Sequence, residues 1–181
     1  MDDVSPSTSR GATLRRRSLS AISLGFLLTG CAGNRSNSES AVSFESADWS
    51  SGEKVSLADF EGSPVLMSSW ATWCEPCKEE LPELQALYED RSDDGLEIVA
   101  VNVNVSGPSE KKIQPMIDTY SLTMPIWRDA DDDFTVTFDG LGVPMSVLVG
   151  RDGKVRQTWQ GQIDPEDPDF QQAIDDALAD R

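Results

Sequence analysis

Histidine is absent from all 181 residues, and cysteine occurs only three times, at Cys31, Cys74 and Cys77. A structural zinc site usually needs about four ligands, most of them Cys or His. Two closely spaced cysteines without any histidine therefore argue against zinc, and the sequence indicates no metal site.

Basic residues are also scarce, because 15 Lys and Arg stand against 32 Asp and Glu and leave a formal net charge of −17. Phosphate contacts require a basic surface, so this charge excludes nucleic-acid binding and disfavours adsorption to anionic lipid. We interpret the acidity as favouring a protein that stays hydrated at high salt, where screening tolerates self-repulsion. An ordinary acidic surface is the alternative.

No apolar run is long enough to span a membrane, which takes about 20 residues. The run 21–29 follows Arg15-Arg16-Arg17 and leads into Leu28-Thr29-Gly30-Cys31, a pattern typical of a lipoprotein signal peptide. We therefore predict a signal peptide at 1–30, lipidation of Cys31 and a polar, lipid-anchored tether at 31–43. The arginines also resemble a twin-arginine signal, and plain secretion is the alternative to lipidation.

Cys74-Glu75-Pro76-Cys77 is the pattern that carries chemistry. If Cys74 caps a helix, unpaired backbone N–H groups and the helix dipole stabilise its thiolate, and Cys77 lies one turn on. Pro76 fits the first turn, where its missing N–H has no partner. A static disulfide is the alternative, but so short a loop gives little entropic benefit. We therefore expect reversible thiol–disulfide exchange, with Cys74 exposed and Cys77 buried.

Periodicity and turn residues predict a folded region of alternating strands and helices from residue 44 onward. We expect Pro82 to kink the first helix and Pro115 to disturb the second. The expected strands are near 42–44, 64–70, 96–105, 124–127, 145–149 and 154–159, with a short ordered segment at 55–60, and the expected helices are 76–88, 110–120, 132–138 and 167–179. This order implies a mixed α/β sheet covered on both faces.

Three segments together resemble the membrane-anchored, thioredoxin-like oxidoreductases of the TlpA/ResA type. The block 70–82, the loop Gly142-Val143-Pro144-Met145 and the hairpin 147–155 carry the resemblance, which extends over about 44–181. It implies an α/β fold with a thioredoxin-like mixed β-sheet flanked by helices, an N-terminal β extension and an inserted helix. It also implies that the Val143–Pro144 bond is cis.

The resemblance also assigns roles to individual residues. Cys74 and Cys77 are the catalytic pair, and Trp73, Pro76, Val143 and Pro144 bind substrate. Classical thioredoxins hold a buried aspartate six residues before the first cysteine, where this chain has Ser68, so Glu80 is the candidate proton carrier. An ordinary first-turn acid that supports the helix dipole is the alternative for Glu80. Glu75, between the cysteines, is expected to disfavour the thiolate and to tune the potential toward a reductant.

The predicted function is a thiol–disulfide oxidoreductase, lipid-anchored on the extracytoplasmic face of the cell membrane. It needs no cofactor beyond the Cys74–Cys77 disulfide, acts as a monomer, and takes electrons from a membrane protein to reduce protein thiols, including those of cytochrome c maturation. Two alternatives stay open. One is a thiol peroxidase of the same superfamily, although Ala71 stands where a threonine is expected. The other is a copper-delivery lipoprotein, although there is no histidine.

Overall fold

The computed structural model describes residues 40–103 and 107–180. The predicted signal peptide, Cys31 and most of the tether lie outside the described residues. Within these ranges no helix is both long and apolar enough to cross a membrane.

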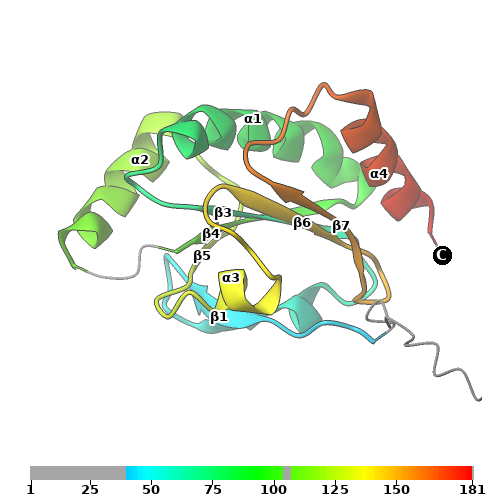
Figure 1. The fold of residues 1–181 in the computed structure, drawn as a ribbon, viewed down its shortest axis with the longest axis horizontal. Helices are drawn as coiled ribbons and strands as arrows, with labels where there is room; N and C mark the ends of the chain where they lie inside the picture. Colours follow the sequence, from blue (N-terminus) through cyan, green and yellow to red (C-terminus); the bar gives the residue numbers. More distant parts are fainter. Residues whose placement is uncertain (1–39, 104–106, 181) are drawn as a thin grey trace, which may run out of the picture. The chain divides into compact units, whose positions relative to one another are not determined.

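A seven-stranded mixed sheet organises the described residues, with strand order β2-β1-β5-β4-β3-β6-β7 (Figure 1). Neighbouring β3, β4 and β5 run parallel, whereas β1, β2, β6 and β7 add antiparallel pairs at the two sides. The strands are β1 Glu45–Asp48, β2 Lys54–Ser56, β3 Val65–Trp70, β4 Glu97–Asn102, β5 Ile126–Arg128, β6 Met145–Val149 and β7 Val155–Gln160. The predicted mixed sheet and the predicted hairpin of its last two strands are confirmed.

The helices lie on both faces of the sheet (Figure 1). One face carries α1 Glu75–Arg91, α2 Ile113–Tyr120 and α4 Pro168–Ala179, and the other carries α3 Asp133–Thr137. Short 3₁₀ turns precede β3, follow α1 and precede α2, at Leu57–Phe60, Ser92–Asp94 and Gly107–Lys112. The predicted covering of both faces is therefore confirmed.

Strand β3 separates two hydrophobic cores because its side chains alternate between the faces. Leu66 and Trp70 pack in the core under the helices α1, α2 and α4. Val65 and Met67 pack in the second core, which is rich in aromatic residues. All six residues of β3 are buried, as expected for a strand covered on both sides.

Both prolines that were expected to disturb helices are accommodated. Helix α1 continues through Pro82 to Arg91, three residues beyond the predicted end. Helix α2 begins at Ile113, not at residue 110, so Pro115 falls in its first turn, where a backbone N–H has no partner within the helix. The prediction of a disturbed second helix is therefore wrong.

The first strand lies later than predicted, because β1 begins at Glu45 and not near residue 42. The Val42 amide donates to the Gly153 carbonyl oxygen at 2.8 Å, and the side chain of Phe44 is buried. Residues assigned to the end of the tether thus already contact the turn between β6 and β7.

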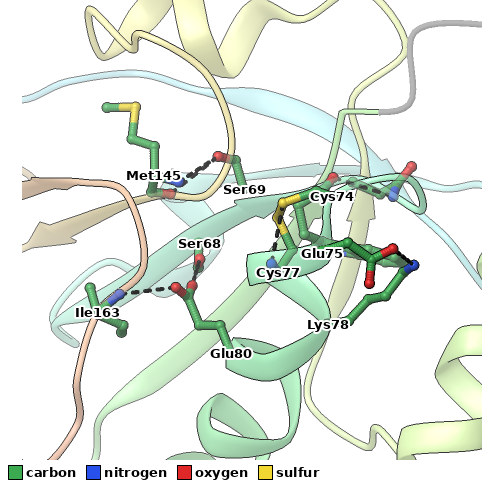
Figure 2. The surroundings of a disulfide bond; sticks show 11 residues. Ser68, Ser69, Cys74, Glu75, Cys77, Lys78, Glu80, Met145 and Ile163 are labelled. Carbon is green, nitrogen blue, oxygen red and sulfur yellow. Dashed lines mark hydrogen bonds and ion pairs between the residues drawn. A yellow bond between two sulfur atoms is a disulfide. The ribbon is translucent and has the colours of Figure 1, made fainter.

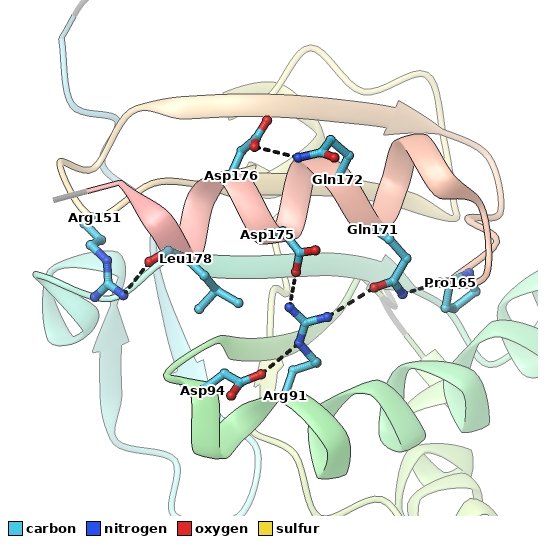
Figure 3. A network of polar contacts seen from close by, with 9 residues as sticks. All are labelled: Arg91, Asp94, Arg151, Pro165, Gln171, Gln172, Asp175, Asp176 and Leu178. Atoms are coloured by element: carbon cyan, nitrogen blue, oxygen red, sulfur yellow. Dashed lines mark hydrogen bonds and ion pairs between the residues drawn. The ribbon is translucent and has the colours of Figure 1, made fainter.

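Arg91, at the end of α1, joins that helix to α4 (Figure 3). Its guanidinium contacts Asp175, donates to the Gln171 side chain at 3.1 Å, and pairs with Asp94 at 3.1 Å. Arg151 donates to the Leu178 carbonyl oxygen at 3.2 Å near the end of α4. The Arg91 contacts hold α4 beside the helix that carries the cysteines, and Arg151 holds the end of α4 to the turn between β6 and β7.

Candidate active site

The two cysteines form a disulfide at the start of α1 (Figure 2), with an S–S distance of 2.00 Å and a Cα–Cα distance of 5.3 Å. Cys74 is the N-cap residue, and its sulfur accepts a hydrogen bond from the Cys77 amide at 3.2 Å. Pro76 lies in the first helical turn, as predicted. A thiolate on Cys74 would accept the same N–H bond and lie at the positive end of the helix dipole.

The prediction that Cys74 is exposed is wrong for the oxidised protein. Cys74 is 3 % exposed and Cys77 is 1 % exposed, so the disulfide is almost fully covered. Its neighbour Trp73 is 63 % exposed. Both cysteines belong to the core that holds Trp70, Leu81 and Leu84. Trp73, predicted to bind substrate, is the large apolar surface available beside them.

The Val143–Pro144 peptide bond is cis, which confirms the expectation from the resemblance. Val143 is partly buried and packs against the core that includes both cysteines. Pro144 is buried, while Leu141, three residues before it, is 89 % exposed. The predicted substrate-binding residues of this loop therefore adjoin the core around the disulfide.

Ser69 holds the loop to β3 (Figure 2). Its hydroxyl donates to the Met145 carbonyl oxygen at 3.2 Å and accepts from the Met145 amide at 3.1 Å. Sequence analysis missed this serine. The signal was available, because a hydroxyl residue in an otherwise apolar buried strand needs a partner.

Glu75 lies at the surface rather than against the sulfurs. Its carboxylate pairs with Lys78 at 2.5 Å, and its side chain is 79 % exposed (Figure 2). The ion pair offsets the negative charge that Glu75 brings to the site. The exposed position of Glu75 therefore gives less support than the sequence did to the prediction that Glu75 tunes the reduction potential.

Glu80 is in the core, and the acidic residue in the first turn of α1 is Glu75 instead. Glu80 is 1 % exposed, although it lies only five residues after the start of α1. One carboxylate oxygen accepts from the Ser68 hydroxyl at 2.6 Å and the other accepts from the Ile163 amide at 3.0 Å (Figure 2). Burial raises the pKa of Glu80 above its ordinary range, Ser68 and Ile163 lower it in part, and nearby Glu83 raises it further.

The sequence did not reveal that Ser68 contacts Glu80. Position 68 carries no carboxylate, but its hydroxyl holds the carboxylate that α1 supplies. Unlike the Ser68 hydroxyl, two buried polar atoms of β3 and β6 have no hydrogen-bond partner among the described residues. They are Trp70 Nε1 and Ser146 Oγ.

The described residues contain no group of three or more His, Cys, Asp or Glu side chains placed to hold a metal ion. The chemistry that the site can support is that of its two sulfurs and one buried carboxylate.

A disulfide caps the helix that follows the central strand β3, and a cis-proline loop lies beside it. This arrangement defines a thioredoxin-like fold and site. The chain belongs to the AhpC/TSA family, whose model matches residues 38–158.

Known relatives agree with this assignment. The chain is 35 % identical over 113 residues to "Thioredoxin-like protein YneN" and 35 % identical over 112 residues to "Thiol-disulfide oxidoreductase ResA", both of Bacillus subtilis. Each match covers 62 % of this chain, and the chain spans 65 % of YneN and 61 % of ResA. The solved structure of StoA from Bacillus subtilis is 27 % identical, has a TM-score of 0.60, and is matched over 70 % of this chain and 92 % of its own. The TlpA/ResA-like, thioredoxin-like character expected from the sequence is confirmed.

Proposed function

We propose that the protein is a thiol–disulfide oxidoreductase that acts on protein substrates. The carrying observation is the Cys74–Cys77 disulfide at the N-terminus of α1, beside the cis Val143–Pro144 loop. The relative named ResA carries the same activity in its name. Exchange of this kind needs no cofactor beyond the cysteine pair.

In the reduced protein, the Cys74 thiolate attacks a sulfur of the substrate disulfide and one substrate thiolate leaves. The mixed disulfide is then attacked by the Cys77 thiolate at the Cys74 sulfur, and the second substrate thiolate leaves. The products are a substrate dithiol and the Cys74–Cys77 disulfide seen in the structure. Two electrons have moved from the protein to its substrate.

The proposed direction is reduction, with a membrane protein returning the electrons. A potential nearer to about −270 mV, as in thioredoxin, than to about −120 mV, as in DsbA, fits this role. Keeping extracytoplasmic thiols reduced, including those of apocytochrome c, is the task that such a reductant would perform. The protein would act as a monomer.

We further propose that Cys31 carries a lipid anchor and that the enzyme acts at the extracytoplasmic face of the cell membrane. The lipobox-like Leu28-Thr29-Gly30-Cys31 and the polar residues that follow it support this proposal. Two acyl chains would anchor the protein stably, since each buried methylene contributes about 0.8 kcal/mol. The net charge of −17 suits a salt-rich environment.

A trapping experiment tests the exchange mechanism. Cys77→Ala should leave Cys74 in long-lived mixed disulfides, because the resolving sulfur is missing, and mass spectrometry identifies the trapped substrates. Cys74→Ser is the matched control and should trap nothing. Insulin reduction with added dithiol should be lost in both variants. If Cys77→Ala traps no protein while wild type reduces insulin normally, the assigned roles are wrong.

A thiol peroxidase is the second candidate, because a peroxide that oxidised Cys74 to a sulfenic acid would leave the same Cys74–Cys77 disulfide once Cys77 had displaced water. Peroxide consumption that exceeds insulin reduction by an order of magnitude would favour the peroxidase. A copper titration in the same assay tests delivery of copper, and stoichiometric binding by the reduced protein would support that alternative.

A further inference from the structure

The two donors that hold Glu80 suit a carboxylate in its ionised form. Ser68 Oγ lies 2.6 Å from one carboxylate oxygen and the Ile163 amide lies 3.0 Å from the other. An ionised carboxylate accepts hydrogen bonds only, so each oxygen has a donor. A protonated Glu80 would instead carry an O–H group, which requires an acceptor in a core where it is 1 % exposed.

Ser146 is the second hydroxyl on this side of the sheet. It lies directly opposite Ser68 in the antiparallel pair of β3 and β6, so both side chains point to the same face. Its other neighbour across the strands, Trp159 of β7, packs against the core under α1. Ser146 is 0 % exposed, and its hydroxyl has no partner among the described residues.

The two serines are not hydrogen-bonded to each other in the structure, but their opposed positions in β3 and β6 allow one hydrogen bond to form between them. Cβ atoms of directly opposed residues lie about 4.5–5.5 Å apart, a gap that two hydroxyl groups can span with a hydrogen bond of ordinary length. A buried hydroxyl without a partner is costly, so its presence needs an explanation. The position opposite Ser68 supplies one.

We propose that Ser68 and Ser146 form a reversible hydroxyl chain that positions the proton of Glu80. When Glu80 is ionised, Ser68 donates to it. When Glu80 takes up a proton, its new O–H donates to Ser68 Oγ. The Ser146 side chain, unpartnered in the structure, turns about its Cα–Cβ bond to bring its Oγ within reach, and Ser68 then donates its own hydrogen to Ser146 Oγ. Ser146 thus stabilises the protonated carboxyl only, whereas the Ile163 amide favours the ionised one.

The inference rests on the proposed function, since it assigns this chain a role in the exchange cycle. Glu80 follows Cys77 by one turn of α1 and lies on the same helical face. As the Cys77 thiol becomes the attacking thiolate, its S–H bond breaks and a Glu80 O–H bond forms. Reversal of the hydroxyl chain accommodates that proton without leaving a buried donor unpaired.

The carboxylates near Glu80 all favour its protonated form. Glu83 on α1 raises its pKa, and Glu83 is itself acted on by Glu79, Asp164 and Glu166. Strands β3 and β6 present hydroxyls, and the segment before α4 presents the Ile163 amide. Changing either serine therefore leaves the surrounding charges unaltered.

Infrared titration of the oxidised full chain tests the proposal without requiring activity. The carboxyl C=O band that disappears in Glu80→Gln reports protonated Glu80 as pH is varied. Ser146→Ala should shift the midpoint to lower pH, because the protonated form loses a partner. Ser68→Ala should shift it to higher pH, because the carboxylate loses a donor. A shift of up to about one pH unit is the size that one hydrogen bond gives.

Two variants serve as controls. Ser69→Ala removes a buried hydroxyl from the same strand, but that hydroxyl bonds to the Met145 backbone, so the Glu80 midpoint should not move. Ser146→Thr keeps the hydroxyl and should restore the wild-type midpoint. A Ser146→Ala midpoint equal to wild type, or shifted to higher pH, would overturn the hydroxyl chain. Loss of insulin reduction by the wild type would instead overturn the proposed function.

Discussion

Glu80 is a residue whose environment makes stability depend on pH. Its pKa is raised chiefly by burial, so its contribution to stability is fully present below the pKa of the unfolded chain and is lost as pH rises through the folded pKa. Burying the ionised form costs free energy that the neutral form does not cost.

Glu80→Gln should therefore raise the melting temperature at pH 8 and change it little at pH 4, while thiol–disulfide exchange slows. A glutamine fits the same space and can accept from the Ile163 amide. Thermal unfolding of the oxidised protein across this pH range is the measurement. The exposed Glu79→Gln is the matched control, and parallel stability curves for wild type and Glu80→Gln would contradict the prediction.

At Glu75, the sequence predicts that Glu75→Gln raises the reduction potential, because a charge beside the thiolate is removed. The ion pair with Lys78 and the 79 % exposure reduce the expected change to within about 30 mV at low salt. At 1 M salt the screening length falls to about 3 Å and the change should vanish. Equilibration with glutathione measures it, and Lys78→Gln, which leaves Glu75 unpaired, should shift the potential in the opposite direction. A larger change that persists at 1 M salt would show direct contact with the sulfur.

At the scale of single elements, α1 keeps its helical course although Pro82 removes one backbone donor from its interior. An interior proline costs up to about 3 kcal/mol relative to alanine. Position 82 is exposed, so replacement does not disturb the core.

Pro82→Ala should consequently stabilise the oxidised protein by about 1–3 kcal/mol, because residue 82 regains a hydrogen bond to the Lys78 carbonyl oxygen. Urea unfolding measures the gain. Pro115→Ala is the matched control, since Pro115 lies in the first turn of α2 and is also exposed, and it should gain little. Equal gains in both variants would contradict the prediction, because the loss of proline frees the unfolded chain alike in both and only Pro82 lies in a helix interior.

The elements that the sequence predicted well are those with strong local patterns. The apolar strand at 64–70, the turn residues of the hairpin and the capping Asp167 of α4 determined their boundaries to within a residue or two. The Cys-x-x-Cys spacing predicted the disulfide and the helix start. Periodicity alone did not place the start of α2, because the preceding residues form a 3₁₀ turn with a similar polar pattern.

Contacts between distant segments could not be predicted in this way. Ile163 reaches Glu80 across 83 residues, and Ser69 reaches Met145 across 76. Such pairs depend on the register of neighbouring strands and on how a loop crosses a helix, neither of which has a local signature. For the same reason the sequence did not show that the disulfide is covered.

At the scale of the whole molecule, the net charge of −17 makes self-repulsion a general destabilising term. Raising the salt concentration from 0.1 to 1 M shortens the screening length from about 10 to about 3 Å. The melting temperature should therefore rise, by about 2–4 °C for each 1 kcal/mol that screening contributes. Thermal unfolding in sodium chloride measures this, and in potassium chloride the same rise should appear. A melting temperature that falls with salt would indicate that ion pairs such as Arg91–Asp175 outweigh the repulsion.

The adjacent serines of β3 point to opposite faces of the sheet and make different contacts there. Ser68 serves the carboxylate on the helix side, and Ser69 fastens the proline loop on the other. Sliding β3 by one position would exchange one hydroxyl for the other and leave the polar pattern almost unchanged. The serines therefore cannot set the register of β3. That register must come from four apolar side chains that alternate between two unlike cores, namely Val65, Leu66, Met67 and Trp70. A change at Ser68 can accordingly alter the surroundings of the Glu80 carboxylate without loosening the loop, and a change at Ser69 can do the reverse, provided that these four apolar side chains keep the strand in place.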